Sequence, residues 1–216
     1  QENISRVVYA ASSSTYGDSK KLPKIENEIG SPLSPYAVTK YVNELYAGVF
    51  SNLYGLEIIG LRYFNVFGRK QDPDGAYAAA IPKFIKAFIN HQEPVIHGDG
   101  SQSRDFTYID NVIQANELAA TTKNPNALNQ VYNVACGDQS FLKELVENLR
   151  VLLSDFDSEI KNIKIKNGPE RIGDVKHSLA SIEKAKKLLN YQPTHNLKHG
   201  LNSAIEWYWN YFKTNS

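Results

Sequence analysis

The chain has 216 residues, with 24 lysines and arginines against 23 aspartates and glutamates. This balance argues against a nucleic-acid partner, and no stretch approaches the roughly 18 consecutive apolar residues of a membrane span. The single cysteine excludes an intramolecular disulfide, and the five scattered histidines lack metal-site spacing. We therefore expect a cytoplasmic protein with no metal ion.

An apolar run at residues 7–11 predicts a strand that is buried on both faces. Such a strand needs neighbours, and no earlier segment of the chain supplies them. The first residue is Gln1, and the chain contains no methionine. We expect the chain to be part of a larger fold.

A helix is predicted from Pro35 to Tyr54, because Ser34 can cap its start and Gly55 can end it. A second buried strand is expected at 58–64. Strand, helix and strand form a βαβ unit, which almost always crosses over right-handedly into a parallel sheet. Ligands of such sheets bind beyond the carboxyl ends of the strands. We expect a ligand near these ends, at residues 12–14 and 65–68.

The chain becomes irregular after Gly68, which predicts a change of domain. We expect an α/β protein in which residues 1–71 form part of a doubly wound, Rossmann-type parallel sheet and residues 72–216 form mainly a smaller mixed α/β substrate domain. The segment 131–135 is a candidate strand of the first sheet. Other strands are expected at 94–97 and 163–166, and helices at 79–88, 110–121, 140–153, 181–189 and 197–212.

Tyr36 and Lys40 are four residues apart, so their side chains share one face of the predicted helix. An ammonium beside a phenol stabilises the phenolate, which makes Tyr36 a candidate proton shuttle. Ser12 and Ser14 would point in the same direction if the first strand continues through them. From spacing alone, a packed tyrosine, a solvated lysine and serines that fill a turn remain an open alternative.

Five segments occur in an order that resembles the extended short-chain dehydrogenases/reductases acting on nucleotide sugars. The resemblance covers essentially the whole chain. The segments are Ala-Ser-Ser-Ser-Thr-Tyr-Gly at 11–17, Ser-Pro-Tyr-Ala-Val-Thr-Lys at 34–40, Leu-Arg-Tyr-Phe-Asn-Val-Phe-Gly at 61–68, Gly-Asp-Gly-Ser-Gln-Ser-Arg-Asp-Phe-Thr-Tyr-Ile at 98–109, and Arg-Ile-Gly-Asp-Val at 171–175.

The resemblance implies NAD as cofactor and a UDP-sugar as substrate. Catalysis would rest on Tyr36 and Lys40 with Ser12 and Ser14, and NAD would also meet Tyr63 and Val66. The residues implied to bind the UDP-sugar are Ser12, Ser13, Asn65, Gln71, Ala79, Val95, Ile96, His97, Arg104, Arg171, Asp174 and Ser178. Without the resemblance, ordinary ion pairs would be the favoured explanation of the two arginines.

The turn after Ser12 carries no carboxylate, whereas dehydratases of this family have an acidic residue there. This difference favours reversible oxidation at C4, and so 4-epimerisation through a 4-keto sugar. Ser12, Gln71, Ala79 and Ser178 resemble the residues at the corresponding positions of this family's N-acetylhexosamine 4-epimerases, whose pockets tend to have small residues. The resemblance therefore implies UDP-N-acetylglucosamine and UDP-N-acetylgalactosamine, or their uronic acids, as substrates. Alternatives are a UDP-glucose/UDP-galactose 4-epimerase, another nucleotide-sugar reductase or dehydratase, and a non-catalytic scaffold; a serine hydrolase is disfavoured because no Gly-x-Ser-x-Gly elbow is present.

None of the 13 glycines forms the glycine-rich turn, between a strand and a helix, that holds a dinucleotide pyrophosphate. We therefore expect the 216-residue chain by itself to bind NAD poorly and to be inactive. The resemblance also implies a homodimer that pairs through the helix at 35–54.

Overall fold

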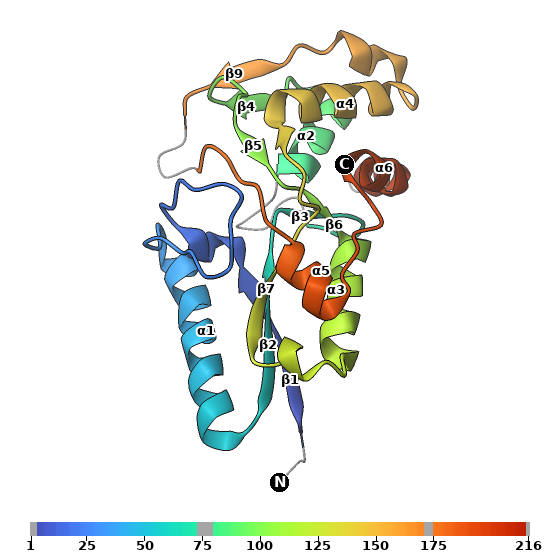
Figure 1. Ribbon diagram of the computed structural model, residues 1–216. Helices are drawn as coiled ribbons and strands as arrows, with labels where there is room; N and C mark the ends of the chain where they lie inside the picture. Colours follow the sequence, from blue (N-terminus) through green and yellow to red (C-terminus); the bar gives the residue numbers. More distant parts are fainter. Residues whose placement is uncertain (1–3, 73–79, 171–174, 215–216) are drawn as a thin grey trace.

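The computed structural model describes residues 4–72, 80–170 and 175–214. Its first part is a three-stranded parallel sheet in which β2 lies between β1 and β7 (Figure 1). The strands are β1 (Arg6–Ser12), β2 (Glu57–Tyr63), β3 (Val66–Phe67), β4 (Val95–His97), β5 (Ser103–Arg104), β6 (Thr107–Tyr108), β7 (Gln130–Val134), β8 (Ser140–Phe141) and β9 (Lys166–Gly168). The helices are α1 (Pro35–Tyr54), α2 (Ala80–Ile89), α3 (Ile109–Thr121), α4 (Leu142–Ser154), α5 (Glu183–Leu189) and α6 (Leu197–Thr214), with 3-10 turns η1 (Ser13–Tyr16), η2 (Pro125–Ala127) and η3 (Ser158–Asn162).

The parallel α/β architecture expected from the sequence is confirmed, and β7 does join the first sheet. Helices cover both faces of this sheet, with α1 on one side and α3 on the other (Figure 1). Consecutive side chains of β2 reach the two faces, as expected for a strand. Arg62 contacts Glu44 on α1, whereas Tyr63 donates a hydrogen bond to Asn116 on α3 at 3.1 Å.

Helix α1 begins and ends where the sequence predicts. The Ser34 side chain accepts a hydrogen bond from the Ala37 amide at 3.1 Å, so an otherwise unpaired helix N–H is satisfied. Gly55 ends the helix in the left-handed conformation, with φ 64°, which glycine adopts at little cost. These two caps fix the position of the residues in the first turns of α1.

Residues 7–11 are not buried on both faces in the described part of the chain, and their burial in the larger fold stays a prediction. Val7 is 37% exposed and Ala10 is also exposed, whereas Ala11 is buried. The reason is the position of β1, which pairs with β2 along one side and has no strand along its other side in the described part of the chain. A run of apolar residues shows only that a strand is able to be buried. Whether the strand is in fact buried depends on the elements that pack beside it.

The later elements form a second apolar core, in which α2, α4 and α6 pack against one another. The strand expected at 163–166 lies a few residues later, where β9 pairs in parallel with β4. The helix expected at 140–153 begins at Leu142, because Ser140 and Phe141 pair antiparallel with β5. In contrast, α3 and α5 pack on the first sheet.

The carboxyl ends of the parallel strands meet at one edge of the sheet. Ser12 is paired with Tyr63, and Tyr63 with Val134. The segments around Asn65, Arg104 and 175–180 come together beyond this edge. The topology therefore assembles a site from segments that are far apart in the sequence.

Candidate active site

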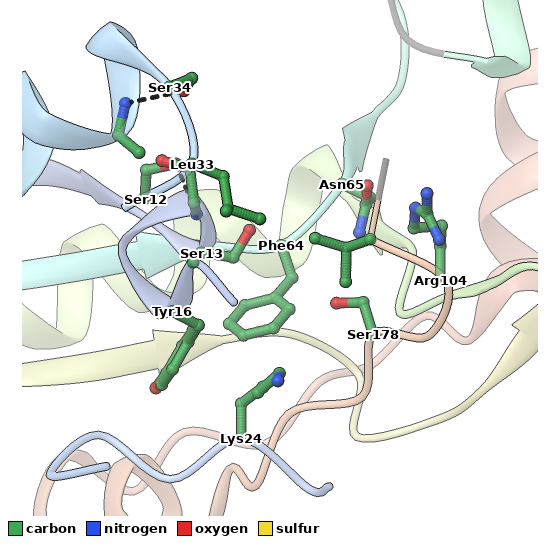
Figure 2. A pocket seen from close by; sticks show the side chains of 14 residues that line it. Ser12, Ser13, Tyr16, Lys24, Leu33, Ser34, Phe64, Asn65, Arg104 and Ser178 are labelled. Atoms are coloured by element: carbon green, nitrogen blue, oxygen red, sulfur yellow. Dashed lines mark hydrogen bonds between the residues drawn. The ribbon is translucent and has the colours of Figure 1, made fainter. Parts of the chain in front are cut away.

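A cavity of about 260 Å³ lies beyond the carboxyl ends of β1 and β2 (Figure 2). Serine hydroxyls line one part of it, and amide and guanidinium groups line another. Its lining residues are Ser12, Ser13, Ser14, Tyr16, Gly17, Lys24, Leu33, Ser34, Ala37, Phe64, Asn65, Arg104, Val175 and Ser178. Six of the residues predicted from the sequence, namely Ser12, Ser13, Ser14, Asn65, Arg104 and Ser178, are thus brought together.

The three serines do not continue the strand. β1 ends at Ser12, and η1 begins at Ser13, with Ser12 as its cap. The Ser12 hydroxyl oxygen accepts hydrogen bonds from the Ser14 hydroxyl at 2.9 Å and from the Ser14 amide at 3.2 Å. The turn therefore brings these two hydroxyls together without the strand alternation that the sequence suggested, and Ser12 keeps its own hydroxyl proton to donate.

Tyr36 and Lys40 lie together on the first turns of α1, as their spacing predicts. The Lys40 Nζ atom is 5.8 Å from the centroid of the Tyr36 ring and donates a hydrogen bond to the Ala10 carbonyl oxygen at 2.9 Å. Neither residue lines the cavity, but Ser34 and Ala37 of the same segment do. Tyr36 is 36% exposed, so its side chain remains accessible from solvent. The ammonium contacts β1 two residues before Ser12.

Asn65, Arg104 and Ser178 surround another part of the cavity (Figure 2). The Asn65 amide donates to the Asp105 carbonyl oxygen at 3.2 Å, and the Ser178 backbone amide donates to the Ser103 carbonyl oxygen at 3.1 Å. Arg104 also donates to the Ser103 carbonyl oxygen, at 2.9 Å. The Arg104 and Ser178 side chains line the cavity, and guanidinium and hydroxyl groups suit phosphate oxygens and sugar hydroxyls.

Three predicted residues lie beside the cavity and make contacts of their own. Tyr63 points to α3, where its hydroxyl is bonded to Asn116, and burial raises its pKa. Gln71 donates to the Val66 carbonyl oxygen at 2.9 Å and accepts from the Tyr208 hydroxyl at 3.2 Å. The structure therefore places Tyr63, Val66 and Gln71 outside the lining of the cavity.

Three residues that the resemblance implied to bind the UDP-sugar, namely Val95, Ile96 and His97, form strand β4 and do not line this cavity. Ile96 is buried in the second core, whereas Val95 is 42% exposed. His97 is half-buried, and its Nδ1 atom lies 3.1 Å from the Pro169 carbonyl oxygen. Of the remaining predicted residues, Ala79, Arg171 and Asp174 lie outside the described part of the chain.

Sequence reasoning missed several residues that line the cavity, among them Tyr16, Lys24 and Phe64. Tyr16 donates to the Asn133 side chain at 2.6 Å, and the Arg62 guanidinium lies over its ring. Neither contact has a local signature, because each joins residues that are distant in sequence. Only the position of Tyr16 and Phe64, next to the predicted strand ends, could have indicated them.

Asp105 holds two neighbouring loops together through hydrogen bonds to their backbone amides. Its buried carboxylate accepts backbone hydrogen bonds from Cys136 and Gly137 at 3.0 Å and from Ala180 at 3.2 Å. Burial raises the pKa of this carboxyl to about 7, although the three amide donors oppose the shift. An ion pair with Arg104, which adjacency in the sequence suggests, is therefore not what holds this carboxylate.

No group of three or more histidine, cysteine, aspartate or glutamate side chains among the residues that the structure describes could hold a metal ion. No described helix is long and apolar enough to span a membrane.

Comparison with known proteins shows the family. A model of the NAD dependent epimerase/dehydratase family matches residues 1–135. UDP-glucuronate 4-epimerase from Thermodesulfobacterium geofontis is 35% identical over 206 residues, which make up 94% of this chain and 59% of the relative.

Solved structures agree with this match. The UDP-N-acetylglucosamine 4-epimerase from Methanobrevibacter ruminantium, in complex with UDP-N-acetylmuramic acid, has a TM-score of 0.86 and 40% identity, over 97% of this chain and 64% of that one. The UDP-glucose 4-epimerase from Thermotoga maritima, with UDP-glucose, also has a TM-score of 0.86, with 32% identity over 99% of this chain and 65% of that one. The chain thus spans less than two thirds of the length of these relatives. It belongs to the NAD-dependent epimerase/dehydratase family.

Proposed function

We propose that the protein containing this chain catalyses NAD-dependent 4-epimerisation of a UDP-hexose. The observation that carries the proposal is the anchoring of Lys40 on the Ala10 carbonyl oxygen, which sets the Tyr36–Lys40 pair beside the end of β1. That strand end supplies the hydroxyls of Ser12 and Ser14, and the cavity beyond it contains Arg104. A proton shuttle, hydroxyl donors and a cation for a diphosphate are the groups that this reaction needs.

In this mechanism Tyr36, as phenolate, takes the proton of the sugar 4-hydroxyl, and Lys40 stabilises the negative charge of the phenolate. Ser12 donates a hydrogen bond to the same sugar oxygen. Bound NAD would supply the hydride chemistry at C4, with the hydride removed from one face of the sugar and restored to the other. Tyr36 then returns the proton, so one residue serves both directions of the reaction.

The described residues fit NAD in part. The Tyr36 hydroxyl and the Lys40 ammonium are donors that suit a nicotinamide ribose and its neighbouring substrate oxygen. The family resemblance implies that Tyr63 and Val66 also contact NAD. The glycine-rich turn that would hold the pyrophosphate, however, is not in this sequence. We accordingly propose that the 216-residue chain alone has no turnover; epimerisation by the isolated chain in a coupled assay would overturn that statement.

For the sugar, we propose UDP-N-acetylglucosamine and UDP-N-acetylgalactosamine, or their uronic acids. The small Ser178 side chain lines the cavity and leaves room there for a substituent. The two relatives of known structure act on UDP-N-acetylglucosamine and on UDP-glucose, so UDP-glucose is the alternative substrate. Incubation of the full-length protein with each sugar, followed by the anomeric proton signals, distinguishes the two.

A homodimer through α1 is also part of the proposal. This helix carries several largely exposed apolar side chains, among them Leu45, Val49 and Leu53 at 53%, 51% and 68% exposure. Apolar surface of this extent on one helix face is typical of a protein–protein interface. The pairing of two copies would bury it.

A further inference from the structure

Lys24 is a buried cation in the cavity wall that the reaction above does not use. It is 4% exposed. Its backbone is held on both sides: its amide donates to the Leu179 carbonyl oxygen at 2.7 Å, and its carbonyl oxygen accepts from Ser181 and Asn133, at 2.9 Å each. The loop that carries Lys24 is thereby fixed between β7 and the segment that contains Ser178.

The side chain of Lys24 has few partners. Its Nζ atom donates to the Ser19 carbonyl oxygen, and no carboxylate lies within ion-pair distance of it in the described part of the chain. An ammonium has three N–H donors, so two remain for other acceptors. Burial lowers the pKa of this group, as expected for a charge with little compensation. A buried cation of this kind is costly unless an anion or several acceptors pair with it.

A second cavity, of about 400 Å³, adjoins the first and shares Gly17, Leu33 and Val175 with it. Lys20, Lys176 and His177 line it, together with Asp18. The Asp18 carboxylate already accepts a hydrogen bond from the Ser31 amide at 2.8 Å. Ser19, the acceptor for Lys24, also lines this cavity, so Lys24 stands where the two cavities meet. A substituent on a sugar in the first cavity has both space and positive charge here.

We propose that Lys24 binds a carboxylate carried by the sugar of the UDP-sugar and so selects acidic sugars; the inference rests on the proposed function. The diphosphate is a less suitable partner, because Arg104 lies on the opposite side of the pocket from Lys24, with Ser178 between them (Figure 2). A sugar carboxylate would take up the two unused donors of the ammonium. Lys24 is thus a specificity-determining residue.

The test compares two matched pairs of ligands by calorimetry, with the full-length protein and NAD. UDP-glucuronate and UDP-glucose differ by a carboxylate at C6, and UDP-N-acetylmuramate and UDP-N-acetylglucosamine differ by a lactyl group. A hydrogen-bonded ion pair predicts that the wild type binds one acid at least about tenfold more tightly than its neutral counterpart. Lys24→Met should reduce that preference below about threefold and leave the affinity for UDP unchanged. The pair that responds identifies the position of the carboxylate.

Lys21→Met is the matched control, because that side chain is 75% exposed and pairs with Glu28; it should keep the preference. Equal binding within both pairs by the wild type overturns the inference, and this comparison requires no variant to fold. A preference that survives in Lys24→Met overturns it as well. If UDP itself does not bind, the proposed function fails with it; if UDP and neutral sugars bind without a preference for acids, only the role of Lys24 fails.

Discussion

The Arg62 guanidinium donates two hydrogen bonds to the Glu44 carboxylate, from Nε to Oε1 at 2.8 Å and from Nη2 to Oε2 at 2.6 Å. The two side chains are 3% and 7% exposed, so the pair is buried between β2 and α1. Glu44 lies one turn beyond Lys40 on α1. This ion pair therefore fixes the helix that carries the proposed catalytic pair against the sheet that carries the serines.

Removal of one partner should leave an unpaired buried charge. We predict that Arg62→Met lowers the free energy of unfolding by about 3–5 kcal/mol, measured by chemical denaturation. Replacement of both partners, with Arg62→Met and Glu44→Leu, should recover part of this loss. Arg150→Met is the control: its pair with Glu147 is much less buried, at 30% and 41% exposure, and should contribute at most about 1 kcal/mol. If Arg62→Met and Arg150→Met lowered the free energy of unfolding equally, the Arg62–Glu44 pair would not have the stabilising role proposed here.

Asp105 should make stability depend on pH. Its pKa is raised from 3.8 to about 7 in the folded chain, so the folded state holds a proton between these values that the unfolded state has lost. The contribution of Asp105 is fully present below about pH 4 and is lost as the pH rises toward 7, with a slope of at most about 1.4 kcal/mol per pH unit.

The measurement compares the wild type with Asp105→Asn across pH 4–8 by denaturant unfolding. The free energy of unfolding of the wild type, relative to that of the variant, should fall as the pH rises. All other ionisable groups are common to the two proteins, so their contributions should cancel in the difference. A difference that is constant with pH, or that grows with it, would show that the carboxyl is already ionised at low pH.

The pocket beside Ser178 should set which sugar is accepted. A tyrosine at this position would fill space next to Arg104, so Ser178→Tyr should lower kcat/KM for UDP-N-acetylglucosamine by about tenfold or more and affect UDP-glucose less. Ser158→Tyr, in η3 outside the cavity, serves as the control. If Ser178→Tyr processed the acetylated sugar as well as its parent does, the proposed sugar preference would fail.

The exposed apolar side chains of α1 predict that the protein forms a dimer through this helix. A charge at the centre of an apolar interface is strongly destabilising, so Leu45→Glu should convert a dimer to monomers in sedimentation experiments. Val151→Glu changes an apolar residue of α4 that is 64% exposed and should leave the dimer intact. If the wild type sedimented as a monomer, the proposed homodimer through α1 would be wrong.

The sequence was most informative where the signals are local. The cap at Ser34, the glycine at Gly55 and the spacing of Tyr36 and Lys40 predicted α1 and its paired side chains, because these signals lie within one element. The segment at 131–135 could be recognised as a strand, but only the pairing with β2 shows its place in the sheet.

The rest of the site could not be derived from local patterns. Lys24 lies in a loop without any recognisable pattern, and it reaches the cavity because residues around 179–181 hold its backbone. The buried role of Asp105 depends on amides of two separate segments. The exposure of β1 likewise depends on which strands flank it. In each case the deciding partner is distant in the chain.

The central claim is that Tyr36 moves the proton of the sugar 4-hydroxyl. Full-length wild-type protein and Tyr36→Phe should be incubated with NAD and UDP-N-acetylglucosamine, or UDP-glucose, and the anomeric protons followed by NMR. The wild type should form the 4-epimer without accumulation of NADH, and Tyr36→Phe should bind the sugar but react about 10²–10⁴-fold more slowly. Tyr46→Phe, on the same helix, should keep normal activity. Epimerisation at an undiminished rate by Tyr36→Phe would contradict the claim.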